Sequence, residues 1–331
     1  MSFSRLVAHN FKQLTTPVIG ATLMLCMGAA QAEDSSLVIR GKDGWLFPGW
    51  GSLTTVDSKS IDSNTALIKD TRDALQARGV KLIVLMLPDK TLFYQDKLPA
   101  DKTLSPQVKE RYQTILGKLK QAGIPTFDDA AVLKQVQSSG KSVFYRTDQH
   151  WAQPAADATA VATAALIKQV EPNLKGNAGS GMQLGKEFNE RRFGDLAERF
   201  LTEDQRKATG RETFVVRRQD TSGSLLDSAP APVHVTGHSM VQPYFGFPQK
   251  LSNVLDRPVS VNWKPGNIGH WVMLLEYLES ADFKKNPPQV LVWQMFEPSY
   301  SYGPQATGFW DNASIMSDSA WRQRMQKALG R

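Results

Sequence analysis

Apolar blocks alternate with amphipathic stretches along the chain, and this alternation predicts strands that are followed by helices. Residues 80–87 are almost all apolar and Pro88 ends the run, which is typical of a parallel strand buried on both faces. Residues 290–295 have the same character. Shorter extended segments are predicted at 125–127, 143–145, 232–236 and 259–263.

Helices are predicted between these segments from the spacing of apolar residues and from stop signals. Gly79 ends an amphipathic helix over 62–78, and Gly123 follows another over 105–121. Further helices are expected at 130–137, 154–170, 247–255 and 270–278, with a closing helix from Ala313. Because strands alternate with helices, we expect a three-layer α/β/α domain with a parallel sheet.

Two segments lie outside this regular alternation. Residues 35–53 are typical of a hairpin at the start of the domain, with Lys42-Asp43-Gly44 as its turn. Residues 176–226 are polar, charged and contain several glycines, and their apolar residues show neither helical nor strand periodicity. We interpret them as an insertion over the site, or a lid, rather than a separate domain.

Residues 1–32 have the pattern of a signal peptide. A basic lead precedes an apolar run over 18–30, which is shorter than the roughly 20 residues that a membrane-spanning helix needs. Ala30-Gln31-Ala32 predicts cleavage after Ala32, so that the domain would occupy 33–331 in the periplasm. The alternative is an uncleaved anchor in the inner membrane.

Composition narrows the chemistry of the exported chain. Its one cysteine, Cys26, lies in the leader, and Leu25 stands before it where a lipoprotein signal needs a small residue. The mature chain would have no thiol, which excludes disulfides, cysteine–zinc sites and thiol nucleophiles. Net charge is +7, and it falls by two to +5 when Arg5 and Lys12 leave with the leader. A net charge of this size is compatible with binding to an acidic glycan or to lipid head groups, and equally with an ordinary protein surface. The sequence lacks the stripe of basic and aromatic residues that would indicate nucleic-acid binding.

Candidate chemistry lies at the ends of two predicted strands, where open α/β sheets place their working residues. The strand over 232–236 runs into Gly237-His238-Ser239. A serine at such a turn exposes its hydroxyl, and the N–H groups after it can face an oxyanion. The alternative role for Ser239 is that of a helix N-cap.

A serine nucleophile needs a base, and four histidines remain after cleavage. His150 is the best candidate, because Asp148 lies two residues before it and can bond its far ring nitrogen. Asp148-x-His150 could also be half of a metal site, but no second cluster completes one, so we expect neither metal nor cofactor. We expect His238 in a turn or pocket wall and His234 buried against a partner, and His270 either as a cap or in the pocket.

Several motifs together resemble those of the alginate O-acetyltransferase family, the AlgX and AlgJ type. The resemblance covers about residues 38–300, and its most specific part is Asp148-x-His150-Trp151. The other motifs are Tyr145-Arg146-Thr147, Gly44-Trp45-Leu46-Phe47, Leu87-Pro88-Asp89-Lys90 and Gly237-x-Ser239. The resemblance implies an SGNH-hydrolase-like domain in which the aspartate and histidine precede the serine, and this chain has that order.

The resemblance also implies a function and partners. It implies a periplasmic transferase that acetylates an exopolysaccharide such as alginate or cellulose and receives acetyl groups through a membrane-bound O-acyltransferase, beside other exopolysaccharide-biosynthesis proteins. Ser239 would carry the acetyl group, His150 would be its base and Asp148 would orient the histidine. Arg146, Trp151 and Lys90 stand where family members line the site; the alternatives are a packed ring for Trp151 and an exposed charge for Lys90. Asn267, on the loop after a later strand, could add an oxyanion donor.

Departures from the family pattern keep other functions open. The family's tryptophan-glutamate-x-proline-glutamate-arginine motif is replaced by Trp293-Gln294-Met295-Phe296-Glu297-Pro298. We also expect the carbohydrate-binding module of the AlgX branch to be absent. One rival function is a carbohydrate acetylesterase with the same triad, in which water rather than sugar takes the acetyl group. The other is a non-catalytic subunit that binds or assembles polysaccharide.

Overall fold

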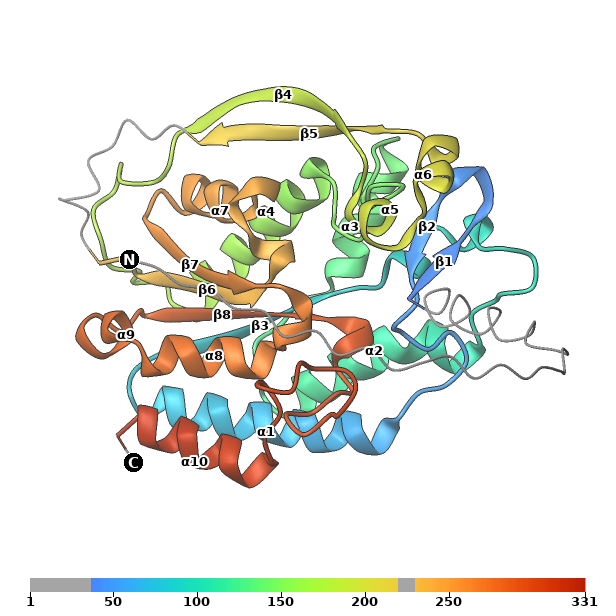
Figure 1. The fold of residues 1–331 in the computed structure, drawn as a ribbon. Coiled ribbons are helices and arrows are strands. Elements are labelled where there is room, and N and C mark those ends of the chain that lie inside the picture. Colours follow the sequence, from blue (N-terminus) through green and yellow to red (C-terminus); the bar gives the residue numbers. More distant parts are fainter. Residues whose placement is uncertain (1–36, 220–229, 331) are drawn as a thin grey trace, which may run out of the picture.

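The centre of the protein, a computed structural model that describes residues 37–219 and 230–330, is a four-stranded parallel sheet (Figure 1). Its order is β3-β8-β6-β7, with β3 at Lys81–Leu87, β8 at Val290–Phe296, β6 at Val233–His238 and β7 at Val259–Lys264. Lys81 pairs with Val290, and Val233 pairs with both Val290 and Val259. Every residue of β8 is buried, as the apolar run predicts.

Helices cover both faces of this sheet, which confirms the predicted α/β/α layers (Figure 1). One face carries α3 at Asp129–Ser138, α4 at Gln153–Val170 and α7 at Phe247–Leu255. The other carries α1 at Ser58–Gln76, α2 at Pro106–Gln121, α8 at His270–Glu279, α9 at Ala281–Lys285 and α10 at Asp318–Ala328. The helix α1 begins earlier than predicted because Asp57 caps it, accepting a bond from the Ser60 N–H.

Two expectations about regular elements are wrong. Residues 125–127 form no strand: the Val84 N–H donates to the Pro125 carbonyl at 2.9 Å, but no ladder continues from that bond. The closing helix begins at Asp318 rather than near Ala313, because Ser317 caps it and accepts a bond from the Ala320 N–H.

The predicted hairpin is present as β1 at Val38–Arg40 and β2 at Leu46–Pro48, paired antiparallel. Its turn places Asp43 at φ 54° and Gly44 at φ 72°, a left-handed conformation that suits glycine and aspartate. The hairpin contacts the loop that carries Asp148 and His150, since the Leu46 N–H donates to the Arg146 carbonyl at 3.0 Å.

The polar segment over 176–226 has more regular structure than its sequence pattern indicates. It contains β4 at Leu184–Arg192 and β5 at Glu212–Gln219, paired antiparallel, with α5 at Asp195–Phe200 and α6 at Glu203–Thr209 between them. Figure 1 shows the strand pair above α4 and α7, separate from the central sheet. The predicted leader and residues 220–226 lie outside the described residues. Within 37–219 and 230–330, the structure has no helix with the length and apolar character needed to cross a membrane.

Candidate active site

Ser239 lies directly after β6, as the first residue of a short 3-10 turn, Ser239–Val241. The glycine two residues earlier is required by packing, because a Cβ at Gly237 would lie 2.6 Å from the Gln294 side-chain oxygen. That oxygen of Gln294 accepts a hydrogen bond from the His238 N–H at 3.0 Å. The neighbouring strand β8 therefore fixes the turn that presents the serine.

His150 lies in a tight loop that an isolated bridge between Phe144 and Trp151 closes. Its Nε2 is 2.7 Å from the Ser239 Oγ, and its ring stacks on Phe245 with centroids 4.4 Å apart. Its Nδ1 is 2.6 Å from the Asp148 Oδ1, which also accepts the His150 N–H at 2.9 Å. Because this carboxylate turns back onto the residue two positions ahead, the two-residue spacing is enough to form a serine–histidine–aspartate relay.

The charges around the relay favour a charged or strongly polarised histidine. Burial would raise the pKa of Asp148, but the charge of His150 and the hydrogen bonds to this carboxylate hold it well below its usual range. Burial alone would lower the pKa of His150, and the carboxylates of Asp148 and Asp195 raise it above its ordinary value. A raised pKa makes the neutral form of His150 a stronger base toward Ser239.

Asp195 is a part of the site that the sequence analysis did not identify. Its N–H donates to the Asp148 Oδ2 at 3.0 Å, and its own Oδ2 is 3.7 Å from the His150 Nδ1. Burial, together with repulsion from Asp148, raises the pKa of Asp195 to about 7. Gly194 makes this approach possible, since a Cβ there would lie 2.4 Å from the Thr147 carbonyl. A glycine–aspartate pair in a polar segment is too common to have indicated this role.

Asp148, His150 and Asp195 also form a group whose potential ligand atoms lie within 4.8 Å of one another, close enough for a metal ion. Each carboxylate already has partners: Asp148 accepts from His150 and from the Asp195 N–H, and Asp195 accepts from the Gln149 N–H and side-chain amide at 2.9 and 2.6 Å. These bonds account for the arrangement of all three side chains, and we assign no metal role to them.

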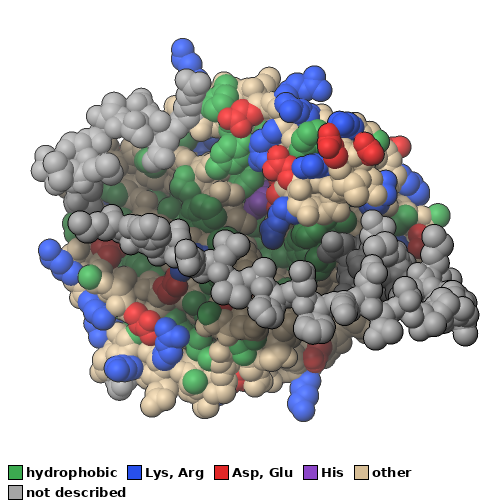
Figure 2. Space-filling model, in the orientation of Figure 1, with side chains coloured by type: hydrophobic (Ala, Val, Ile, Leu, Met, Phe, Trp, Pro, Cys, Tyr) green, Lys and Arg blue, Asp and Glu red, His purple; other side chains and the backbone are tan. Residues whose placement is uncertain are grey.

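Ser239 opens onto a cavity of about 280 Å³. Its wall includes the aromatic side chains of Trp50, Phe200, Phe296 and Phe309. Polar and charged side chains also line it, from Gln149, Arg199, His238, Asn267 and Ser299. On the face seen in Figure 2, apolar side chains gather in a hollow in the middle of the molecule, with charged side chains around it. An apolar cavity with a few convergent polar groups is the usual form of a small-molecule or sugar site.

Of the four secondary residues that the sequence suggests, the structure brings only Asn267 to this cavity. Lys90 is fully buried rather than an exposed charge, and its ammonium lies beneath the catalytic loop instead of in the cavity. Burial lowers the pKa of Lys90 to about 7, while Glu212, Asp148, Asp195 and Asp89 oppose that fall.

Trp151 and Arg146 also face away from Ser239. The Trp151 ring is fully buried and packs on Phe247, with centroids 5.4 Å apart, so it belongs to the core. The Arg146 guanidinium donates to the carbonyls of Gly44 and Thr209, both at 3.1 Å, and so joins the hairpin to α6.

The remaining described histidines are buried between β6 and α8 and have different surroundings. His238 lies in the cavity wall, where it was expected. His234 has partners for both ring nitrogens, Ser260 at 2.7 Å and Asn262 at 2.8 Å. His270 is enclosed by tryptophans, and neither of its ring nitrogens has a hydrogen-bond partner among the described residues.

Comparisons with known proteins agree with this geometry. The sequence model of a family described as "SGNH hydrolase-like domain, acetyltransferase AlgX" matches residues 38–297. The protein named "probable alginate O-acetylase AlgJ" of Pseudomonas aeruginosa is 27% identical, over 98% of this chain and 84% of its own. The protein of the same name from Pseudomonas fluorescens is 30% identical, over 78% of this chain and 67% of its own.

Solved structures give the same fold. The O-acetyltransferase domain of Pseudomonas putida AlgJ superposes with a TM-score of 0.71 at 25% identity, over 88% of this chain and 99% of that one. Pseudomonas aeruginosa AlgX superposes with a TM-score of 0.60 at 18% identity, over 85% of this chain and 69% of that one, a likeness of fold alone.

Proposed function

The chain belongs to the family of SGNH-hydrolase-like acetyltransferase domains of the AlgX type, and from this premise we propose that it acetylates an exopolysaccharide in the periplasm, with Ser239 as the nucleophile. The observation that carries the proposal is the hydrogen-bonded series Asp148–His150–Ser239, with contacts of 2.6 and 2.7 Å, at the edge of an aromatic cavity. Because relatives are named alginate O-acetylases, alginate is the first acceptor to test.

The first half of the reaction loads the enzyme. The His150 Nε2 takes the hydroxyl proton of Ser239 as its Oγ attacks the carbonyl carbon of an acetyl donor. The donor's leaving group takes that proton from His150 when its bond to the acetyl carbon breaks, which leaves an ester on Ser239. Asp148 orients the ring and stabilises the imidazolium. The backbone N–H groups at the start of the Ser239–Val241 turn and the Asn267 amide would stabilise the oxyanion.

The second half transfers the acetyl group to sugar. A sugar hydroxyl gives its proton to the His150 Nε2 and attacks the ester carbon, and Ser239 leaves with that proton to regenerate the enzyme. Hydrolysis differs only in that water replaces the sugar. The aromatic walls of the cavity favour the transferase, because they shield the ester from water and offer faces on which a sugar ring can lie.

Location and partners follow from the same proposal. We expect the leader to be removed after Ala32, so that the domain over 33–331 works in the periplasm with its segment over 176–226 as an insertion beside the site. A membrane-bound O-acyltransferase would supply the acetyl group, and other exopolysaccharide-biosynthesis proteins would present the polymer. Amino-terminal sequencing of the periplasmic fraction should find Glu33 first.

The test is intact-mass spectrometry of the mature protein after incubation with 4-nitrophenyl acetate, followed by addition of alginate oligosaccharide. Wild-type protein should gain one acetyl group and pass it to sugar faster than to water, and Ser239→Ala should gain none. Ser138→Ala, which alters an exposed serine at the end of α3, serves as the control and should load normally.

The outcomes separate the rival functions. Acetyl lost to water at the same rate with or without any sugar would identify an esterase. A wild-type protein that binds oligosaccharide but never forms a Ser239-dependent adduct would instead be a binding or assembly subunit.

A further inference from the structure

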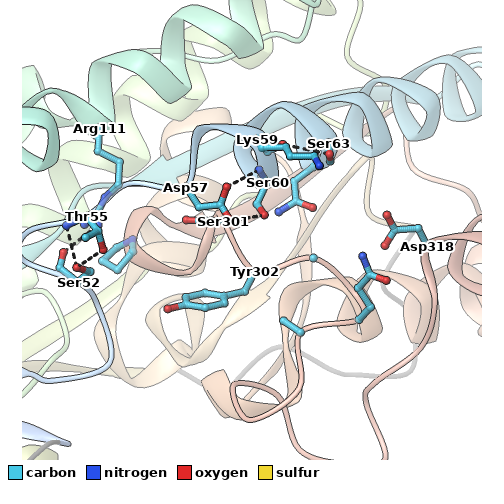
Figure 3. A pocket seen from close by; sticks show the side chains of 15 residues that line it. Ser52, Thr55, Asp57, Lys59, Ser60, Ser63, Arg111, Ser301, Tyr302 and Asp318 are labelled. Carbon is cyan, nitrogen blue, oxygen red and sulfur yellow. Dashed lines mark hydrogen bonds between the residues drawn. The ribbon is translucent and has the colours of Figure 1, made fainter.

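A second cavity, of about 480 Å³, lies beside the amino-terminal ends of α1 and α10 (Figure 3). We call it the α1–α10 groove. Asp57, Ser60 and Ser63 line it from the start of α1, Tyr302 from the segment after β8, and Asp318 from the start of α10. Its volume is within the range of pockets that hold small ligands.

The groove has polar groups that the protein itself does not use. Among the described residues, the side chains of Lys59, Ser301, Tyr302 and Gln305 face this cavity without a hydrogen bond to any protein atom. One carboxylate oxygen of Asp318, itself buried, has no hydrogen-bond partner in the part of the chain that the structure describes. Hydroxyl, amide, ammonium and carboxylate groups around one hollow match the donors and acceptors of a sugar ring, which presents several hydroxyls at once.

An aromatic ring adds the apolar contact that a sugar needs. Tyr302 stacks on Phe309 with centroids 3.7 Å apart and an interplanar angle of 12°, so one face of its ring is covered and its position is fixed. Figure 3 shows the Tyr302 ring below Asp57 and Ser301, with Asp318 farther along the groove on the other side of the Tyr302 backbone. Rigid aromatic side chains with nearby polar groups hold and orient ligands in this way.

The groove adjoins the catalytic cavity through two separate segments of chain. Trp50 lines the catalytic cavity and Ser52 lines the groove. In the other segment, Ser299 and Phe309 line the catalytic cavity, whereas Tyr302 lines the groove. The two segments are in close contact where they separate the catalytic cavity from the groove, since a Cβ at Gly51 would lie 3.0 Å from Pro298.

A buried ion cluster keeps this junction rigid. Arg111 donates to Glu297 and to the Ser52 carbonyl, and its guanidinium is 3.6 Å from Asp89. Asp89 follows β3 and Glu297 follows β8, so the cluster ties the ends of two sheet strands to the segment that separates the cavities. A polymer that spans both hollows would therefore cross a fixed edge rather than a mobile loop.

We propose that the α1–α10 groove binds a further sugar unit of the same polysaccharide chain whose acetylated unit lies at Ser239. This inference rests on the proposed function, because a polymer acceptor must continue beyond the unit that reacts. Lys59 makes no salt bridge among the described residues and would bind a carboxylate of a uronate, while Asp318 and Gln305 would bind ring hydroxyls.

The test compares acceptors of different length with variants of the groove. The double variant Lys59→Ala/Gln305→Ala removes two exposed side chains without hydrogen bonds, and Ser63→Trp fills the groove. The control is Lys69→Ala, which removes an exposed lysine farther along α1 that pairs with Asp73 at 2.9 Å. The acceptors are mannuronate disaccharide and octasaccharide. Binding of the octasaccharide to Ser239→Ala protein, with and without the groove changes, gives a readout that needs no catalysis.

We expect both groove variants to raise the KM and the Kd for the octasaccharide about tenfold. Acetyl loading from 4-nitrophenyl acetate and transfer to the disaccharide should stay unchanged, as should every property of Lys69→Ala. Equal effects on both acceptors, or none on the octasaccharide, would overturn the groove as a sugar site. Failure of acetyl loading in the otherwise unaltered enzyme would instead overturn the proposed function.

Discussion

Asp195 shows how one side chain can set the working pH of the relay. Neutral His150 is the form that accepts the Ser239 proton, so the acid limb of the kcat/KM profile reports the pKa of His150. The Asp195 carboxylate, 3.7 Å from the His150 Nδ1, raises that pKa. In Asp195→Asn we expect the acid limb to move to lower pH by about one unit.

The measurement for Asp195→Asn is the pH profile of acetyl release from the donor. Glu198→Gln is the matched control, because it removes an exposed carboxylate from the same short helix and should leave the acid limb in place. An unchanged acid limb in Asp195→Asn would mean that this carboxylate only supports the loop.

Single residues were predictable where the partner is close in sequence. Asp148 and His150 could be paired because two residues separate them, and Ser239 because a glycine turn follows a strand. Asp195 and Gln294 could not be identified, since each reaches the site through a contact between distant segments. Lys90 was misjudged for the same reason: a lysine at a strand end is usually exposed, and its four carbonyl partners come from distant segments, one from β2 and three from the loop at 144–151.

The three histidines buried between β6 and α8 make the free energy of unfolding depend on pH. Burial lowers the pKa of His234 and of His238 to about 4, and that of His270 well below its usual value. The unfolded chain binds these protons near pH 6.5. Between about pH 6.5 and 4 the unfolded state therefore binds protons that the folded state does not, and the free energy of unfolding falls as pH decreases through this window.

His270→Phe tests that dependence at one position. The Phe ring keeps the packing against the tryptophans and removes two nitrogens that have no partner among the described residues, so we expect a change at neutral pH of no more than about 1 kcal/mol. The free energy of unfolding should then fall less steeply between neutral pH and pH 5, because the unfolded variant binds one proton fewer than the unfolded wild-type chain. Urea unfolding at pH 7 and at pH 5 measures this dependence. Tyr277→Phe is the control, since it alters the same layer between β6 and α8 and should keep the wild-type dependence on pH. The same dependence in His270→Phe as in wild type would show that His270 does not cause it.

At the level of elements, the sequence predicted what apolar periodicity determines. The sheet strands and their covering helices, apart from the short α9, were found because each buries a face that must be apolar. The pair β4–β5 was not found, because β4 has no fully buried residue and only Phe214 and Val216 of β5 join the core, so that the segment has no clear apolar periodicity. The strand order, with β8 inside the sheet, is a property of long-range pairing that no local pattern contains.

The whole molecule brings the active site together from three regions of the chain. The relay residues come from the loop at 144–151 and from the end of β6, and the arm over 184–219 supplies Asp195. Glu212 at the start of β5 also accepts the Thr147 N–H at 3.1 Å, so the arm holds the catalytic loop at several points. The site is thus a product of the complete fold rather than of one motif.

Lys90 is the group that joins these regions most directly, and its removal tests the integrity of the whole assembly. Its ammonium lies 2.6–3.1 Å from four carbonyls, one in β2 and three in the catalytic loop, at Leu46, Tyr145, Arg146 and Asp148. Lys90→Met fills the same space but removes the ammonium donor from all four carbonyls, of which Arg146 still accepts the Leu46 N–H at 3.0 Å. We expect the free energy of unfolding to fall by about 3 kcal/mol or more, because unsatisfied buried acceptors keep their full desolvation cost.

The matched control for Lys90→Met is Lys97→Met, which breaks an exposed salt bridge of 2.7 Å to Asp43 in the hairpin turn. That change should lower the free energy of unfolding far less than Lys90→Met does, since exposed ion pairs contribute little. Urea unfolding of both variants gives the comparison, and the rate of acetyl loading shows whether the catalytic loop has moved. Similar unfolding midpoints for the two variants would show that the four carbonyls find other partners and that Lys90 does not hold the loop.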